Sequence, residues 1–267
     1  WAVHSGPDSN PLCAALAEAS GRPIGLRPGH GFYHDHAPRG MIEKSFYISR
    51  TVARRPAGVG QICPEVENFT HNAMGKSPHG TAVESSLDLA VGCDSLSYAV
   101  LCSAHEPMDW YERLLAKFAA WRPFWERCTA TWANTQPSGL EVPIGQEHVG
   151  RKLDEGEKPF AWAGGINLNR IYNLAAVGLP LCTAPQAACG AVLHAAVIPG
   201  LFDQELNGLL RGGLLLDGAA LWKLQERFGA ERLGVRAVIP ERLEFHERLT
   251  ADPLNGQHAG RIWRLFL

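Results

Sequence analysis

The chain contains 267 residues, of which 46% are hydrophobic and 19% charged, and its formal net charge is −2. This is the composition of a globular protein with room for one large domain or two ordinary ones. The near-neutral charge and the lack of a basic run give no electrostatic reason to expect nucleic acid or a membrane surface as a partner. No apolar stretch of the sequence reaches the length of a membrane span.

Seven cysteines are scattered along the chain without a CxxC pair. An odd number at this spacing favours buried free thiols over disulfides and provides no zinc or thioredoxin-type motif. We therefore expect a reducing, cytoplasmic environment. The chain begins at Trp1 without a methionine or a signal peptide, and we expect that an N-terminal part of the protein precedes it.

Strand-like and helix-like segments alternate in the first half of the chain. In chain order the pattern predicts the end of a strand at residues 2–4, a helix at 11–19, a strand at 23–27, a helix at 41–54, a strand within GQICPEVENF (60–69), a helix opened by a capping box at Thr81 and Glu84 and ending at 91, a strand at 96–101, and a long helix at 108–132 that contains Pro123. Strands and helices that alternate at this spacing indicate parallel strands joined by crossover helices.

The second half repeats this alternation after a polar segment. Residues 136–159 are rich in proline, glycine and charge, which predicts an interdomain linker. The segments that follow are predicted as a helix at 167–177, strands at 180–184 and 190–198, a helix capped by Asp203 and ending near Arg211, a strand at 214–217, a helix at 218–228, and strands at 235–240 and 260–267. They fit a small doubly wound sheet. We therefore divide the chain into domains at 1–135 and 160–267, with a linker at 136–159.

Two glutamates lie two residues apart in the strand predicted within GQICPEVENF. Because side chains alternate along a strand, Glu65 and Glu67 share one face while Val66 occupies the other. Burying unpaired carboxylates is costly, but near the carboxyl ends of parallel barrel strands such groups meet solvent and substrate, and active sites collect there. The alternative is that both acids pair with basic residues such as Arg27, at the end of the preceding strand.

The segments RPGHGFYHD, PEVENF and KS..GTAVESSLDLAVGCDSLSYAVL, in this order, resemble the last strands of a clan-A glycoside hydrolase barrel. They are similar in particular to bacterial β-galactosidase-like enzymes related to family 42. GLPLCTAP and DQELNGLLRGGLLLDGAALWKLQERFG resemble the glutamine-amidotransferase-like domain, also called the trimerisation domain, that follows the barrel in such enzymes. The resemblance implies an α/β protein in which strands 5–8 of a (β/α)8 TIM barrel, its C-terminal half, precede a small doubly wound amidotransferase-like domain.

This resemblance also implies a retaining glycosidase mechanism, with an acid/base at the end of strand 4 and a nucleophile at the end of strand 7. Counted back from the linker, QICPEVE corresponds to strand 7. Glu65 is then the preferred nucleophile, because an acid followed by an apolar residue is usual there, and Glu67 is the other candidate. The residues expected to bind the sugar are Arg27, His30, Tyr33 and Asn68. The implied partners are a carbohydrate substrate and further copies of the chain through the second domain, with no cofactor.

Strand 4 and its Asn-Glu pair are absent from the sequence, so the chain is expected to be inactive without further residues. Pro64 inside the central strand is also unusual, because it usually signals a bulge or an edge. The histidines of GHGFYHDH, with Asp35, have no standard metal-ligand spacing, and we expect them to face the sugar rather than a metal. The rival interpretation is a non-catalytic carbohydrate-binding or oligomerisation module in which the glutamates are structural.

Overall fold

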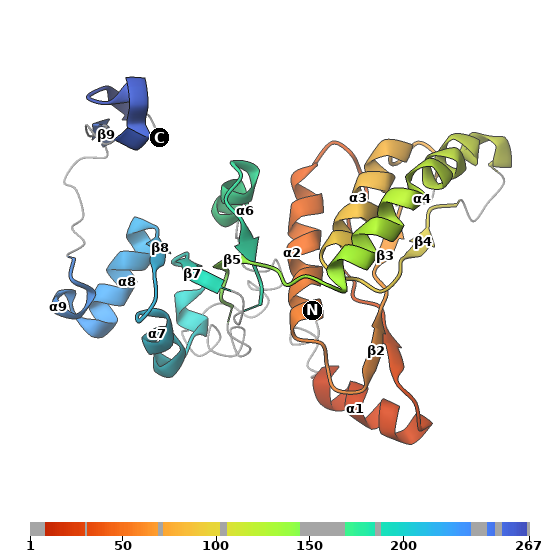
Figure 1. Ribbon diagram of the computed structural model, residues 1–267, viewed down its shortest axis with the longest axis horizontal. Coiled ribbons are helices and arrows are strands. Elements are labelled where there is room, and N and C mark those ends of the chain that lie inside the picture. The colour runs from red at the N-terminus through yellow and green to blue at the C-terminus, as the bar shows by residue number, and fades with distance from the viewer. Residues whose placement is uncertain are drawn as a thin grey trace. The chain divides into compact units, whose positions relative to one another are not determined.

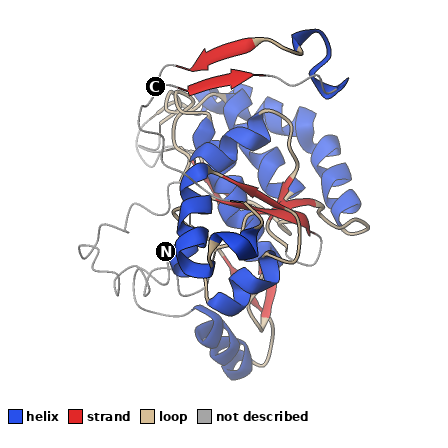
Figure 2. Ribbon diagram, turned by 90° about the vertical axis from the view of Figure 1, so that its left-hand side faces the viewer, coloured by secondary structure: helices blue, strands red, loops and turns tan. Residues whose placement is uncertain are grey.

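The computed structural model describes residues 9–29, 31–68, 72–101, 106–144, 169–184, 188–235, 245–248 and 253–265. The chain divides into two compact units, Trp1–Ala220 and Leu221–Leu267. The boundary falls inside the predicted second domain. Helices and parallel strands are mixed in the first unit, which is therefore α/β (Figure 1). Figure 2 distinguishes the helices, in blue, from the strands, in red. In the described part of the chain, no helix combines the length and the apolar character needed to cross a membrane.

The alternation predicted for the first half is present. Its elements are α1 (Ser9–Ser20), β1 (Ile24–Leu26), α2 (Arg39–Ala53), β2 (Val59–Ile62), β3 (Glu65–Glu67), α3 (Pro78–Ala90), β4 (Ser97–Ala99), the 3-10 turn η2 (Met108–Tyr111) and α4 (Glu112–Trp132). The strands pair in parallel, β1 with β2 and β3 with β4. The strand end predicted at residues 2–4 lies outside the described residues.

Pro64 divides the strand that was predicted as one. Immediately before the proline, Cys63 N donates to Leu26 O of β1 at 2.9 Å. The carbonyl oxygen of Pro64 itself accepts a hydrogen bond from Ser97 N of β4 at 3.0 Å. A proline has no N–H to continue a ladder. The chain therefore pairs with β1 up to Cys63 and with β4 from Pro64 onward.

Apolar side chains from the strands pack against the helices in two clusters. Ile48 of α2 packs with Val59 and Ile62 of β2 in the first cluster. In the second, Val66 of β3 is fully buried against a group from the β4–α4 region, namely Val100, Tyr111 and Leu114. The first half thus has its core between the strands and the helices that connect them.

The prediction that a capping box opens helix α3 is wrong. Helix α3 begins three residues earlier, at Pro78, and Ser77 is its N-cap, with its side chain accepting a hydrogen bond from Gly80 N. Proline is well suited to a first helical turn, because its missing N–H has no intrahelical partner there. Thr81 and Glu84 are therefore interior residues of the helix, and Glu84 is available for other contacts.

A four-stranded parallel sheet forms the rest of the first unit. Its strands are β5 (Gly139–Glu141), β6 (Leu181–Cys182), β7 (Ala188–Leu193) and β8 (Leu214–Leu216), in the order β6-β5-β7-β8. The helices that follow its strands or precede them are α6 (Asn169–Ala176), α7 (Asp203–Leu209) and α8 (Gly218–Phe228). With the first strand inside the sheet, the order reverses between β5 and β7, as in doubly wound folds of the flavodoxin type.

Strand β5 lies in the segment predicted as a linker, so that prediction is wrong for residues 139–141. The close approach of a neighbouring strand requires a glycine at position 139. Gly139 has φ 155°, and a Cβ would lie 2.5 Å from Pro180 O. β5 and β6 therefore approach each other more closely than a side chain permits.

Two other details of the second half differ from expectation. Phe202, not Asp203, is the N-cap of α7, and its backbone N–H donates to the Glu205 carboxylate at 2.7 Å. In the second unit, β9 (Phe245–Arg248) and β10 (Ile262–Leu265) form a separate antiparallel pair rather than extending the parallel sheet. This unit also contains α9 (Ala230–Leu233) and η6 (Pro253–His258). The strand predicted at 235–240 lies almost wholly outside the described residues.

Candidate active site

Strand β3 presents Glu65 and Glu67 on one face. Val66 between them points into the apolar cluster at α4, so the two carboxylates lie on the opposite face. In the parallel register with β4, Glu65 is paired with Ser97 and Glu67 with Ala99, whose side chains are small. Both glutamates are half-buried, and the predicted shared face is confirmed.

Arg27 contacts the first of these carboxylates. Its Nη1 lies 2.9 Å from Glu65 Oε1, and the two side chains are 58% and 26% exposed. Arg27 directly follows β1, so the ends of two adjacent parallel strands meet here. This is the pairing that the structural alternative anticipated for Glu65. An ion pair this exposed stabilises a fold by only about 0–1 kcal/mol, so its clearest effect is to direct the carboxylate.

Tyr33 lies close enough to both glutamates for their charges to act on it. Burial first, and then the negative charges of Glu67 and Glu65, raise the pKa of Tyr33. Its hydroxyl is therefore a proton donor at neutral pH. Tyr33 is also partly exposed, so a bound molecule can reach a group made of a guanidinium, two carboxylates and a phenol.

The loop that carries Tyr33 is fixed against the start of α3. Asp35 Oδ2 accepts a hydrogen bond of 2.7 Å from Ser77 N. A Cβ at Gly80 would lie only 2.1 Å from Asp35 Oδ1, so glycine permits this approach. The rings of His34 and His36 stack with their centroids 5.2 Å apart.

The other two predicted substrate-binding residues are not among the side chains of this group that the structure describes. His30 lies outside the described residues. Asn68 is only 1% exposed and its backbone N–H donates to Ala99 O at 3.2 Å. Its Oδ1 has no hydrogen-bond donor within the described chain. The structure thus brings Arg27, Tyr33, Glu65 and Glu67 together, and places Asn68 beneath the surface.

Sequence reasoning missed a buried charge cluster at the edge of β3, in contact with the backbone of the two glutamates. It consists of Lys44 from α2, Lys76 from the loop before α3, and Glu84 and Asp88 from α3, all at most 3% exposed. The Glu84 carboxylate joins the two lysines: Oε1 accepts from Lys44 at 2.5 Å, and Oε2 accepts from Lys76. Lys44 also lies 3.3 Å from Asp88 Oδ2. The helical spacing of Glu84 and Asp88 was the available signal.

Each buried lysine also donates to the backbone of one glutamate. Lys44 Nζ donates to Glu65 O at 2.5 Å, and Lys76 Nζ donates to Glu67 O at 2.8 Å. Residues 64, 66 and 68 face β4, as the bonds from Ser97 N to Pro64 O and from Asn68 N to Ala99 O show. The carbonyls of Glu65 and Glu67 therefore point to the other edge of β3, where the ammonium groups satisfy them.

The charges in this cluster shift the pKa values of its members in different directions. Burial lowers the pKa of Lys44, but the attraction of Asp88 and Glu84 outweighs it, and the net shift is upward. For Lys76, burial outweighs the attraction of Glu84, and the pKa is lowered. Burial raises the pKa of Asp88 to about 7, against the opposing effect of Lys44.

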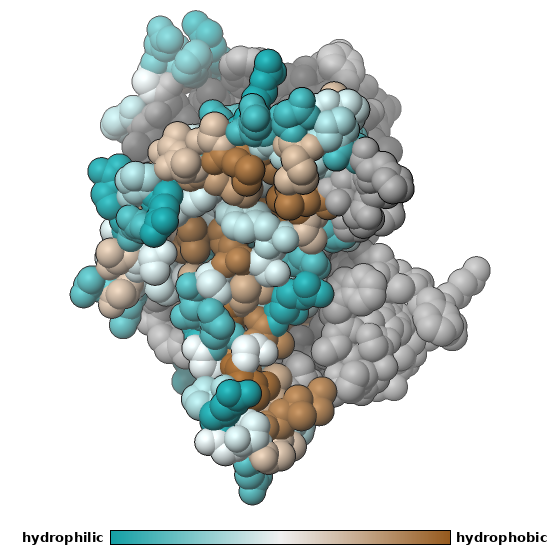
Figure 3. Space-filling model, turned by 90° about the vertical axis from the view of Figure 1, so that its right-hand side faces the viewer, coloured by the Kyte–Doolittle hydropathy of each residue, from teal (hydrophilic) through white to brown (hydrophobic). Residues whose placement is uncertain are grey.

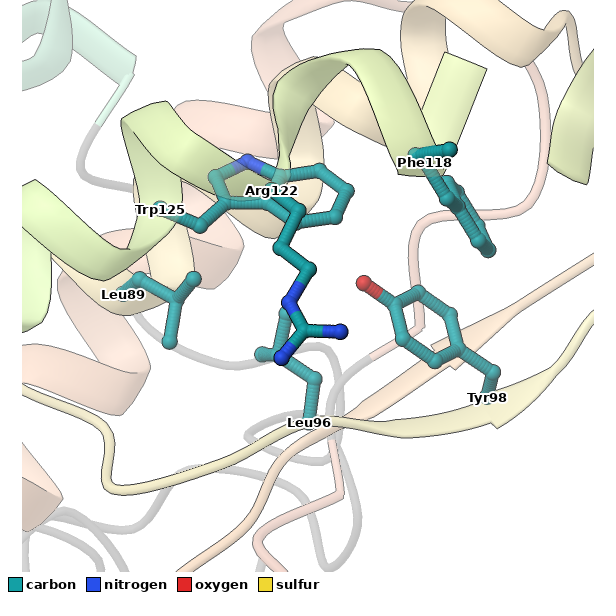
Figure 4. Close-up of a pocket in the computed structure, with 7 residues that line it drawn as sticks. Leu89, Leu96, Tyr98, Phe118, Arg122 and Trp125 are labelled. Carbon is teal, nitrogen blue, oxygen red and sulfur yellow. The ribbon is translucent and has the colours of Figure 1, made fainter. Parts of the chain in front are cut away.

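An apolar pocket lies on the other face of the same strands (Figure 4). Tyr98 of β4 is the register partner of Val66, so its side chain lies on the side opposite the glutamates. Its hydroxyl donates to Ser85 Oγ at 3.1 Å. The lining side chains are Leu89, Leu96, Tyr98, Phe118, Ala119, Arg122 and Trp125. Apolar side chains extend in a broken band down the side of the molecule that Figure 3 presents. The pocket contains no carboxylate and is separate from the candidate site.

The carboxyl edge of the four-stranded sheet carries a His–Asp pair. His194 follows β7 and Asp217 follows β8, with His194 Nε2 3.4 Å from Asp217 Oδ2. Asp217 also accepts from Ala220 N at 2.6 Å, at the start of α8. Cys182, at the end of β6, is buried, and burial raises the pKa of its thiol. Among the described residues, no group of three or more histidines, cysteines and acids has the arrangement of a metal site.

Comparison with known proteins adds no identification. No family model matches the chain, and neither the curated proteins nor the solved structures contain a significant match. The site therefore has to be interpreted from its own chemistry.

Proposed function

We propose that this chain carries the nucleophile side of a retaining glycoside hydrolase site, with Glu65 as the nucleophile. The observation that carries the proposal is the pair Glu65 and Glu67, which share one face at the carboxyl end of a parallel strand, beside Arg27 and Tyr33. Carboxylates at such strand ends are where barrel hydrolases perform their chemistry.

The order of the strands supports a barrel as the framework. β1, the β2–β3 segment and β4 follow one another in sequence and pair in parallel in that order, with α2 and α3 as crossovers. Among the described residues, β1 and β4 each have a strand partner on one side only. A complete barrel therefore requires further strands at both edges, and we propose that these supply the acid/base. The β6-β5-β7-β8 sheet is compatible with an amidotransferase-like domain beside it.

The chemistry divides between two carboxyl groups. A Glu65 oxygen forms a bond to the anomeric carbon while the bond from that carbon to the leaving oxygen breaks, and the acid/base gives the leaving group its proton. Arg27 directs the Glu65 oxygen. Tyr33 and Glu67 can hold sugar hydroxyls, one as a donor and the other as an acceptor. A β-galactoside is the proposed substrate.

A fluorosugar tests the nucleophile separately from the acid/base. With a 2-deoxy-2-fluoro-β-galactosyl fluoride, the carboxylate displaces fluoride, which leaves without protonation, and the glycosyl ester accumulates. We expect mass spectrometry of the full chain to locate the label on Glu65. Glu65→Gln should abolish labelling and Glu67→Gln should slow it. Wild-type protein that stays unlabelled by this reagent and by its gluco and manno analogues would overturn the proposal.

One observation favours the rival function. Glu65 is already ion-paired with Arg27, as expected for a structural acid in a carbohydrate-binding or oligomerisation module. In that case galactosides bind without labelling, and Arg27→Met has the same effect on stability as Glu65→Gln. Calorimetric titration with galactose and the labelling experiment together separate the two functions.

A further inference from the structure

Each of the two buried lysines contacts three oxygen atoms, one of which is a backbone carbonyl of a β3 glutamate. An ammonium group has three N–H donors. Lys44 donates to Glu65 O and Glu84 Oε1, and its ammonium group also lies 3.3 Å from Asp88 Oδ2 as an ion pair. It thereby connects the backbone of the proposed nucleophile to helix α3.

Lys76 has a different third partner. Its Nζ donates to Glu67 O and Phe32 O, both at 2.8 Å, and to Glu84 Oε2. It also lies 5.1 Å from the centroid of the Phe32 ring. Phe32 immediately precedes Tyr33, so Lys76 joins the loop that carries the phenol to the strand end that carries Glu67.

Stability alone is a weak reason for such a cluster. Two ammonium groups and two carboxyl groups are removed from water, and replacing a buried ion pair by apolar side chains is often neutral or stabilising. What the charged groups add is direction, because each hydrogen bond fixes a specific backbone carbonyl. The carbonyls that they fix belong to Glu65, Glu67 and the residue before Tyr33.

We propose that Lys44 and Lys76 are positioning residues with separate tasks: Lys44 places Glu65 for attack, and Lys76 places Glu67 and the Tyr33 loop for sugar binding. Glu84 holds the two lysines at a fixed separation. This inference rests on the proposed function, because it assigns the nucleophile to Glu65 and hydroxyl recognition to Glu67 and Tyr33.

The test uses two matched double variants of the full chain, which share the Asp88→Asn change. Lys44→Met/Asp88→Asn keeps the Lys76–Glu84 pair, and Lys76→Met/Asp88→Asn keeps the Lys44–Glu84 pair, so each variant retains one of the two buried ion pairs of Glu84. Asp88→Asn alone is the common control. Circular dichroism first establishes that all three variants are folded at the assay temperature.

Fluorosugar labelling then separates the two tasks. For Lys44→Met/Asp88→Asn we expect the labelling rate at saturating reagent to fall by about 10²-fold, because a misplaced nucleophile loses orientation. For Lys76→Met/Asp88→Asn we expect the half-saturating concentration to rise by about tenfold, the loss of roughly one hydrogen bond. Both doubles behaving like Asp88→Asn, or changing both constants equally, would overturn the inference.

Hydrogen exchange provides a readout that does not require labelling. Lys76→Met/Asp88→Asn should accelerate amide exchange in residues 31–38, while Lys44→Met/Asp88→Asn should accelerate it in 63–67 and leave 31–38 unchanged. Absence of labelling in the wild type together with these separate exchange patterns would reject the proposed function and retain the positioning. The same exchange pattern in both doubles would reject the positioning itself.

Discussion

Glu84 Oε1 accepts a hydrogen bond from Lys44 Nζ at 2.5 Å, and both side chains are 1% exposed. Removing one partner of such a pair leaves the other charge buried without compensation. We expect Glu84→Ala to lower the free energy of unfolding by about 3–5 kcal/mol, measured by urea denaturation. The matched control is Glu126→Ala, because Glu126 pairs with Arg122 at the surface. That variant should change stability by less than about 0.5 kcal/mol, and similar losses in the two variants would contradict the burial of Glu84.

The raised pKa of Asp88 predicts an unusual pH dependence of stability. The native state keeps the Asp88 proton up to pH about 7, whereas the unfolded chain releases it near the ordinary value of 3.8. The stability that Asp88 contributes is therefore fully present below pH 3.8 and is lost as the pH rises to about 7. In urea titrations at several pH values, the difference between wild type and Asp88→Asn should change steadily across this interval. A constant difference would show that Asp88 titrates normally.

Replacing the proposed nucleophile should affect chemistry much more than folding. Glu65→Gln removes an ion pair whose arginine is 58% exposed, so we expect its unfolding free energy to stay within about 1 kcal/mol of wild type. Labelling by the fluorosugar should disappear in the same variant. If Glu65→Gln instead destabilises the chain by several kcal/mol while labelling persists, the carboxylate is a structural anchor.

Gly139 offers a test of the sheet order. A Cβ there would lie 2.5 Å from Pro180 O, so Gly139→Ala must separate β5 from β6. We expect a loss of about 1–3 kcal/mol in unfolding free energy, the usual cost of overpacking. Gly208→Ala in α7 is the control, since nothing lies within 4 Å of its Cβ position, and it should be neutral or stabilising by up to about 1 kcal/mol. A neutral Gly139→Ala would place residues 139–141 outside the sheet.

The alternation of side chains in PEVE was sufficient to predict that Glu65 and Glu67 share one face of their strand. Val66 is apolar and its neighbours are acidic, so the period of two assigns them to opposite faces, and the structure has them there. The parallel strands followed from the spacing of β1, β3 and β4. The contact between Arg27 and Glu65 was foreseeable as well, because Arg27 directly follows β1 and Glu65 lies just beyond β2, its parallel neighbour.

The buried cluster was not predictable by the same rules. On α3, the polar residues at 81, 84, 85 and 88 form one face at helical spacing, and such a face usually meets solvent. Here that face is the buried one, because Lys44 and Lys76 compensate its charges. Only a long-range contact reveals this, since Lys44 is 40 residues from Glu84. The helical spacing places Glu84 and Asp88 on one face of α3, but it does not show that this face is buried.

Strand β5 was missed for a compositional reason. Its three residues lie between the end of a long helix and a polar, charged segment, and a window of ordinary length averages them into that segment. The close approach of Gly139 to Pro180 depends on the partner strand and has no local sign. A three-residue strand beside such a segment thus leaves too little periodic pattern to be detected.

Pro64 divides one extended segment into two parts that are held in place by different neighbours. Residues up to Cys63 are anchored to β1, while Glu65 and Glu67 depend on β4 and on two ammonium groups. Arg27 is the side chain that connects the end of β1 to the first of these acids. Substitutions before Pro64 must therefore preserve the packing of Val59 and Ile62 against α2, while those after it must preserve the hydrogen bonds to Lys44 and Lys76.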